Sequence, residues 1–318
     1  MADDSRSTGT DGASATESTA PLTRSAEYWF DDGNIILQVE STQFRLVKSI
    51  LSMHSSVFSD MFTIPLPAYE PTIDNCPVVV LSGDTAQDWT LFLGVIFPKS
   101  YSTKLPPFRL VAAMLRLSKK YDFPLFRHDC VRRLKQEFPT SLAEYNKVSN
   151  RWTFLTTGGQ SIKLAVISLA KEIGLPSILP INYLLIITDY KGSAMQKILD
   201  PNNQSVNASD RIACLLGYTK LLKLQSTTMF AWLNCQENSR EIPSETCSRR
   251  HHCTAAVSKI FVDSFNPHAE VWILSGWNED WDSDLCSSCG EKAKGIYDAG
   301  RETCWQQLPA VLGLPDWE

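Results

Sequence analysis

The segment from residue 34 to residue 62 constrains the fold more than any other part of the chain, because two strand patterns run directly into two helix patterns. Apolar and polar residues alternate from Ile35 to Val39 and again from Phe44 to Leu46. This alternation predicts a hairpin with one buried face. The helical turns that follow can cover that face, and the segment offers apolar surface without a catalytic group. It therefore indicates a protein-binding module.

Two short helices are expected directly after the hairpin. The first runs from Lys48 to Met53, and the second follows Ser55 and Ser56, either of which can act as its N-cap. Phe58 belongs to the apolar stripe of the second helix. Both helices are too short to be stable alone, so we expect them to pack on the hairpin.

A third strand and three longer helices complete the first domain. The strand runs from Val78 to Leu81, and Asp84 and Gln87 then have the spacing of a capping box, which predicts that Asp84 caps the next helix. Prolines separate or end the helices, at Pro107, Pro124 and Pro139. A small sheet with helices on it predicts an α+β fold.

These elements, taken together, resemble a BTB/POZ domain over residues 27–140. The segments that carry the resemblance are residues 34–37, 44–51, 55–62 and 115–121, followed by Cys130 and Leu134. The lead Trp-Phe-Asp-Asp-Gly-Asn, which ends at Asn34, and the final residues 308–318 are similar to the expanded BTB family of mushroom-forming (basidiomycete) fungi. The resemblance implies a small sheet capped by helices and a role in protein–protein interaction.

The resemblance also implies what the domain would contact. BTB domains self-associate or dock a cullin scaffold, and an acidic and a basic residue line a groove at the interface of many BTB dimers. Lys48 keeps the usual basic position, whereas Asn34 stands where the family often has Asp and Val47 where it often has His. The interaction residues expected from the resemblance are Phe58, Met61, Phe62 and Tyr101. Core packing is the alternative for Phe58 and Met61.

Composition limits the classes of function. The 318 residues carry a formal net charge of -5, so the chain lacks the overall basic field that nucleic-acid binding favours. Nine cysteines are too few for a disulfide scaffold, and their odd number favours reduced thiols in a cytoplasmic or nuclear protein. No signal peptide is recognisable, and no apolar run is long enough for a membrane span.

Four parts are expected along the chain. Residues 1–26 are polar and predict a disordered leader, and residues 27–140 form the BTB/POZ domain. Residues 141–238 contain apolar helical patterns and predict a helical extension, which in BTB proteins commonly helps to seat a cullin. Residues 239–318 form a small module rich in cysteine and tryptophan.

A cysteine pattern in this last module predicts a metal site. Cys286 and Cys289 have the two-residue spacing of a zinc knuckle, and Cys247 and Cys253 can supply two further ligands. His251 or His252 can replace one of these cysteines as a ligand. Structural zinc is one interpretation, and the alternatives are buried thiols without a metal and a redox-active pair.

No catalytic motif is recognisable, since the chain lacks a nucleophile elbow, a zinc-protease helix and a dinucleotide glycine pattern. We therefore expect a non-enzymatic protein without a small-molecule substrate. It would bind protein partners, either a second copy of itself or a cullin. Binding a cullin would make it a substrate adaptor of a ubiquitin ligase. The alternative is a transcriptional or chromatin regulator whose cysteine module touches nucleic acid. The acidic residues around the knuckle, such as Asp280 and Asp282, count against that alternative.

Overall fold

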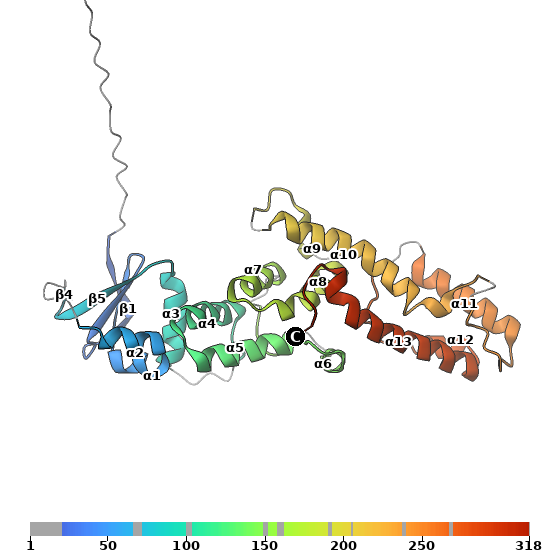
Figure 1. Ribbon diagram of the computed structural model, residues 1–318, viewed down its shortest axis with the longest axis horizontal. Coiled ribbons are helices and arrows are strands. Elements are labelled where there is room, and N and C mark those ends of the chain that lie inside the picture. The colour runs from blue at the N-terminus through green and yellow to red at the C-terminus, as the bar shows by residue number, and fades with distance from the viewer. Residues whose placement is uncertain are drawn as a thin grey trace, which may run out of the picture. The chain divides into compact units, whose positions relative to one another are not determined.

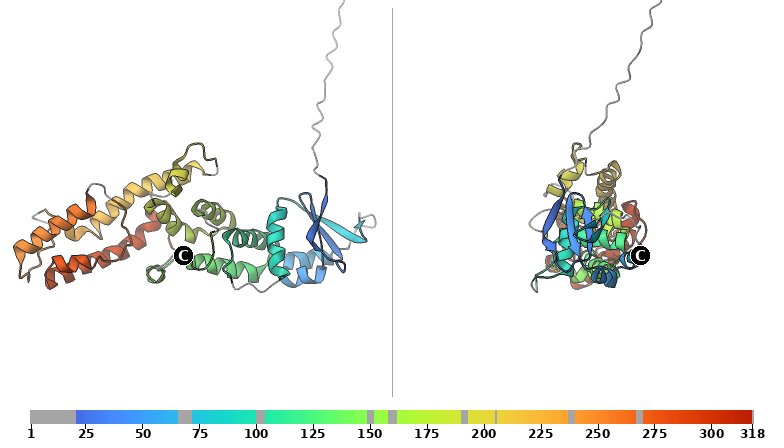
Figure 2. Two further views of the ribbon diagram at one scale, coloured as in Figure 1. Left: turned by 180° about the vertical axis from the view of Figure 1, so that it is seen from behind. Right: turned by 90° about the vertical axis from the view of Figure 1, so that its left-hand side faces the viewer.

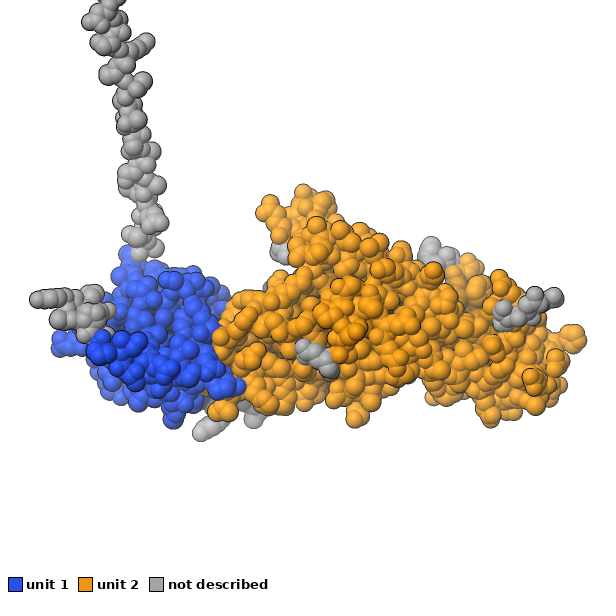
Figure 3. Space-filling view, in the orientation of Figure 1, with its two compact units in different colours: residues 1–101, 120–124 blue, residues 102–119, 125–318 orange. Residues whose placement is uncertain are grey.

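The computed structural model describes residues 21–65, 72–99, 104–148, 152–157, 162–189, 193–204, 206–236, 240–266 and 270–317. The chain divides into two compact units, residues 1–101 with 120–124 and residues 102–119 with 125–318 (Figure 3). The first unit holds the sheet and the second is helical, which confirms the predicted α+β fold class.

Five strands form the sheet of the first unit in the order β1-β3-β2-β5-β4. Their bounds are β1 Thr23–Trp29, β2 Ile35–Val39, β3 Thr42–Leu46, β4 Thr72–Ile73 and β5 Cys76–Leu81. β2 and β3 form the expected antiparallel hairpin, with Leu37 opposite Phe44, and β5 pairs in parallel with β2. The third strand is therefore confirmed, and it begins two residues earlier than Val78.

The central strand β2 is buried on both faces rather than on one. Ile36 is as inaccessible as Ile35 and Leu37, although its side chain points to the opposite face of the sheet. At the edge of the sheet, β1 pairs in parallel with β3. It begins at Thr23, within the segment predicted as a disordered leader, so that part of the prediction is wrong. Residues 1–20 of the predicted leader lie outside the described residues.

Three helices of the first unit follow the strands. They are α1 Lys48–His54, α2 Ser56–Thr63 and α3 Ala86–Ile96, and α1 and α2 pack on each other (Figure 1). Ser55 caps α2, because its side chain accepts the backbone N–H of Phe58 at 3.0 Å. The predicted cap of α3 at Asp84 is wrong, since Thr85 accepts the N–H of Asp88 at 3.1 Å.

The second unit consists of helices. α4 Phe108–Tyr121 and α5 Pro124–Glu137 contribute most of their length to it. The helices that follow are α6 Leu142–Lys147, α7 Lys163–Ile173, η1 Pro176–Ile178, α8 Leu179–Thr188, α9 Ser193–Leu199, α10 Ala208–Thr227, η2 Ala231–Leu233, α11 Arg250–Phe265, α12 Asp280–Asp284 and α13 Ser287–Val311. α7 packs on α8, and α10 packs on both α8 and α13 (Figures 1 and 2).

The long helix α13 approaches the end of α10 closely at one glycine. A Cβ atom on Gly300 would lie 2.4 Å from the backbone nitrogen of Met229, which is closer than real Cβ contacts allow. Only glycine fits there without moving backbone. In the part of the chain that the structure describes, no helix is both long and apolar enough to cross a membrane.

Candidate interaction surface and cysteine cluster

The first turn of α1 is fixed by a residue at the start of the hairpin. The side chain of Asn34 accepts the backbone N–H of Lys48 at 2.8 Å, which satisfies one of the unpaired donors at the helix N-terminus. The Lys48 ammonium lies 5.4 Å from the ring centroid of Phe62 on α2. A neutral side chain from the start of the hairpin thus caps the N-terminus of α1.

Phe58 is a core residue. Its ring is fully buried and lies 5.0 Å from Tyr121, 5.7 Å from Phe62 and 6.0 Å from Trp89, measured between ring centroids. Such aromatic neighbours stabilise one another beyond the area that they bury. Phe58 therefore holds α2 on the domain, as the core-packing alternative expects, and offers no surface to a partner.

The other predicted interaction residues lie differently. Met61 and Phe62 are half-buried on α2, and Tyr101 lies outside the described residues. Two apolar side chains that the sequence pattern did not single out are far more exposed: Met53 on α1 is 71% exposed and Ile64, the C-cap of α2, is 66% exposed. Large exposed apolar side chains near helix ends are candidate contacts for a protein partner.

A cluster of hydrogen-bonded polar side chains joins the start of α2 to the end of α4 and the start of α3. Ser55 donates its hydroxyl to the carbonyl of Tyr121, and the Tyr121 hydroxyl donates to the carboxylate of Asp84. Asp84 also accepts from the indole N–H of Trp89 at 3.0 Å and from the Lys120 ammonium at 2.6 Å. Burial, and secondly the hydrogen bond to Asp84, raise the pKa of Tyr121 above its ordinary value. The Asp84 carboxylate thus joins the start of α3 to the end of α4 through three side-chain partners.

Four cysteines converge in the second unit. The sulfur atoms of Cys247, Cys253, Cys286 and Cys289 all lie within 4.8 Å of one another, and none of the four forms a disulfide. Cys247 is partly exposed and the other three are buried. Cys253 lies in the first turn of α11, and Cys286 is the N-cap of α13, with Cys289 in its first turn. The structure thus brings together the four cysteines that the sequence predicted as ligands.

Backbone donors surround the sulfurs. The N–H of Ser244 donates to Cys289 Sγ at 3.3 Å, and the N–H of Cys286 donates to Cys253 Sγ at 3.4 Å. The backbone N–H of Cys289 lowers the pKa of the Cys286 thiol to about 6, whereas burial raises the pKa of Cys253 to about 12. His251 and His252 are exposed and are not part of this cluster.

The remaining cysteines are scattered. Cys76, Cys130, Cys214 and Cys304 are buried, whereas Cys235 is exposed. Burial raises the pKa of Cys130 and of Cys214 to about 12, so both remain protonated thiols at neutral pH. These four buried cysteines pack as small apolar residues, in contrast to the convergent set of four.

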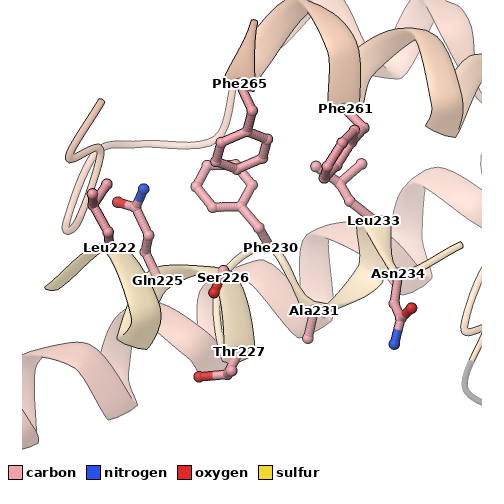
Figure 4. A pocket seen from close by; sticks show the side chains of 10 residues that line it. All are labelled: Leu222, Gln225, Ser226, Thr227, Phe230, Ala231, Leu233, Asn234, Phe261 and Phe265. Carbon is pink, nitrogen blue, oxygen red and sulfur yellow. The ribbon is translucent and has the colours of Figure 1, made fainter. Parts of the chain in front are cut away.

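A pocket of about 540 Å³ opens between the end of α10, η2 and α11 (Figure 4). Phe230, Phe261 and Phe265 supply aromatic side chains to it, and its lining contains no titratable residue. The side chain of Gln225 also lines the pocket, and both of its polar atoms have hydrogen-bond partners. It donates to the carbonyl of Glu270 at 2.7 Å and accepts the N–H of Trp272 at 2.7 Å. The two hydroxyl side chains of the lining, Ser226 and Thr227, both donate to the backbone carbonyl of Lys223.

Comparison with known protein families identifies the first domain. Residues 29–137 match the family model described as the BTB/POZ domain. No curated protein matches the chain. The matched range begins at the end of β1 and ends with α5, and it contains the hairpin, the α1–α2 pair and the aromatic cluster around Phe58. Residues 29–137 of this chain are therefore a BTB/POZ domain, a module of protein–protein interaction.

Proposed function

We propose that this protein is a non-enzymatic adaptor whose BTB/POZ domain docks a cullin scaffold while its C-terminal helices bind a client protein. The observation that carries the proposal is the order of the parts: the BTB/POZ domain is followed by packed helices, in which α8 contacts both α7 and α10, and Lys171 of α7 donates to Asp210 of α10. In BTB proteins such a helical extension commonly helps to seat a cullin.

The mechanism of an adaptor is proximity. A scaffold bound at one place and a client bound at another are held on one chain, which raises their effective concentration relative to each other. Such a protein needs two binding surfaces and no catalytic group of its own.

The surface proposed for the scaffold lies on α1 and α2. Met53 and Ile64 are exposed there, and Phe62, two residues before Ile64, has its ring centroid 5.4 Å from the Lys48 ammonium. Burying exposed apolar side chains on binding is favourable by roughly 25 cal/mol per Å² of apolar area, before association costs. We expect these three residues to contribute more than the neutral groove residue Asn34.

Isothermal titration of the full chain with a purified cullin tests this proposal. We expect binding, and we expect the substitutions Met53→Glu and Ile64→Glu together to weaken it about tenfold or more, equivalent to about 1.4 kcal/mol. Val80→Glu is the matched control, since Val80 is 64% exposed but lies on the sheet strand β5. Unchanged binding by the double variant, or equal loss in the control, would reject this surface.

A further inference from the structure

The cysteine cluster offers a site that protein docking does not require. We propose that Cys247, Cys253, Cys286 and Cys289 bind one zinc ion, which holds the N-terminal ends of α11 and α13 together. The proposal concerns the second unit alone and stands whether or not a cullin binds the first.

Sulfur spacing is the first argument. Zinc bound to four thiolates at about 2.3 Å in a tetrahedron places the sulfurs about 3.8 Å apart. In the structure Cys286 Sγ lies 3.7 Å from Cys247 Sγ, and all four sulfurs lie within 4.8 Å of one another. A disulfide would need about 2.05 Å and would engage only two of them. The four sulfurs already surround a space of the right size for a single ion.

The ligand type and the spacing together select the metal. Four thiolates in a tetrahedron favour zinc or iron over the oxygen-seeking cations magnesium and calcium. Clusters of several iron atoms hold their thiolates farther apart, because metal and sulfide atoms stand between them. Among single ions, zinc is redox-inert and has no geometric preference of its own, as a purely structural site requires.

Helix ends and backbone donors offset the charge of the thiolates. Cys253 lies in the first turn of the 16-residue helix α11, and Cys286 and Cys289 lie at the start of the 25-residue helix α13. The positive end of a helix dipole favours a thiolate there. The N–H groups of Ser244 and Cys286 donate to two of the sulfurs, which is the kind of outer contact that orients metal ligands.

Zinc at this place would close a loop that carries the aromatic cluster of the second unit. Trp277 and Trp281 lie between Cys253 and Cys286 in the chain, and their ring centroids are 4.9 Å apart. Both rings also contact Tyr297 on α13, at 5.4 and 5.8 Å. Loss of the ion would therefore loosen the attachment of these tryptophans to α13.

Metal analysis of the full chain tests the site. The protein is expressed without a metal-binding tag, dialysed extensively against metal-free buffer to remove loosely held ions, and analysed by plasma mass spectrometry. We expect one zinc ion per chain. Replacement by Co²⁺ should give the thiolate-to-cobalt charge-transfer band and the intense visible bands of a tetrahedral sulfur site. A strong chelator should lower the melting temperature and change the tryptophan fluorescence.

Two sets of variants separate a metal site from general packing. Cys286→Ser and Cys289→Ser remove ligands and should abolish zinc binding. Cys304→Ser and Cys214→Ser are the controls, because both cysteines are buried outside the cluster, and these variants should keep the zinc ion. If the ligand variants do not fold, the cobalt spectrum of the unmodified chain decides instead.

Three results would overturn the proposal. The first is zinc at background level together with no cobalt–thiolate band. The second is stoichiometric iron in place of zinc. The third is a disulfide between Cys247 and Cys286, or between any two of the four cysteines, in protein purified under mildly reducing conditions. The last result would favour the redox interpretation of this cluster.

Discussion

The side chain of Asn34 accepts the backbone N–H of Lys48 at 2.8 Å, so Asn34 caps the N-terminus of α1 from the start of the hairpin. Asn34→Ala should remove this bond and lower the free energy of unfolding by about 1 kcal/mol. Asn34→Asp keeps the acceptor and places a negative charge at the N-terminus of α1, so it should retain or slightly raise stability. Urea unfolding measures both, and an alanine variant as stable as the aspartate variant would contradict the capping role.

Phe58 should be the residue on α2 that the fold tolerates losing least. Phe58→Ala leaves a cavity among the rings of Phe62, Trp89, Tyr121 and Phe123, and we expect a loss of about 3–5 kcal/mol in urea unfolding. Met53→Ala is the control, since Met53 is 71% exposed, and it should change stability by no more than about 0.5 kcal/mol. Similar losses for the two variants would show that Phe58 is not a core residue.

Two glycines of α13 should respond to alanine with opposite signs. At Gly300 the added Cβ would meet the backbone of Met229, so Gly300→Ala should destabilise the second unit. At Gly295 nothing lies within 4 Å of the added atom, so Gly295→Ala should stabilise the helix by up to about 1 kcal/mol. Thermal unfolding of both variants measures the difference, and destabilisation of equal size at both positions would contradict the close approach.

Stability should fall in alkaline solution through Tyr121. Burial raises its pKa above the ordinary value of 10.0, so the folded protein keeps a proton that the unfolded chain releases above that pH. The contribution is therefore complete below pH 10 and is lost as the pH rises toward the folded-state pKa. We expect Tyr121→Phe to be less stable at pH 8 but to lose stability less steeply between pH 9.5 and 11. Parallel curves for the two proteins would contradict this account of Tyr121.

Local patterns predicted the hairpin and the helices that follow it well. Alternation around Leu37 and Phe44 located the paired strands. Ser55, which caps α2, was identified as one of two possible caps of that helix. Asp84 was wrongly predicted to cap α3, because its carboxylate is used by Trp89, Lys120 and Tyr121. Two of these three partners come from far along the chain, which a local pattern does not contain.

Two elements gave little signal in the sequence. Only Tyr28 of β1 is buried, so this edge strand lacks the alternation that identifies strands. In α13 the buried face consists largely of small residues and cysteine, including Gly290, Ala293, Gly300 and Cys304, rather than of leucine. The hydrophobic periodicity that identifies an amphipathic helix was therefore weak in this segment. The two-residue spacing of Cys286 and Cys289 nevertheless indicated that both belong to one cysteine cluster, although it did not predict the helix that begins there.

Sedimentation velocity of the full chain, alone and mixed with a purified cullin, tests the central claim most directly. The account predicts a faster-sedimenting complex that contains both proteins, and its partial loss when Met53 and Ile64 are both replaced by glutamate. A chain that sediments as a monomer at every concentration, and forms no complex with the cullin, would contradict the proposed adaptor role of the BTB/POZ domain.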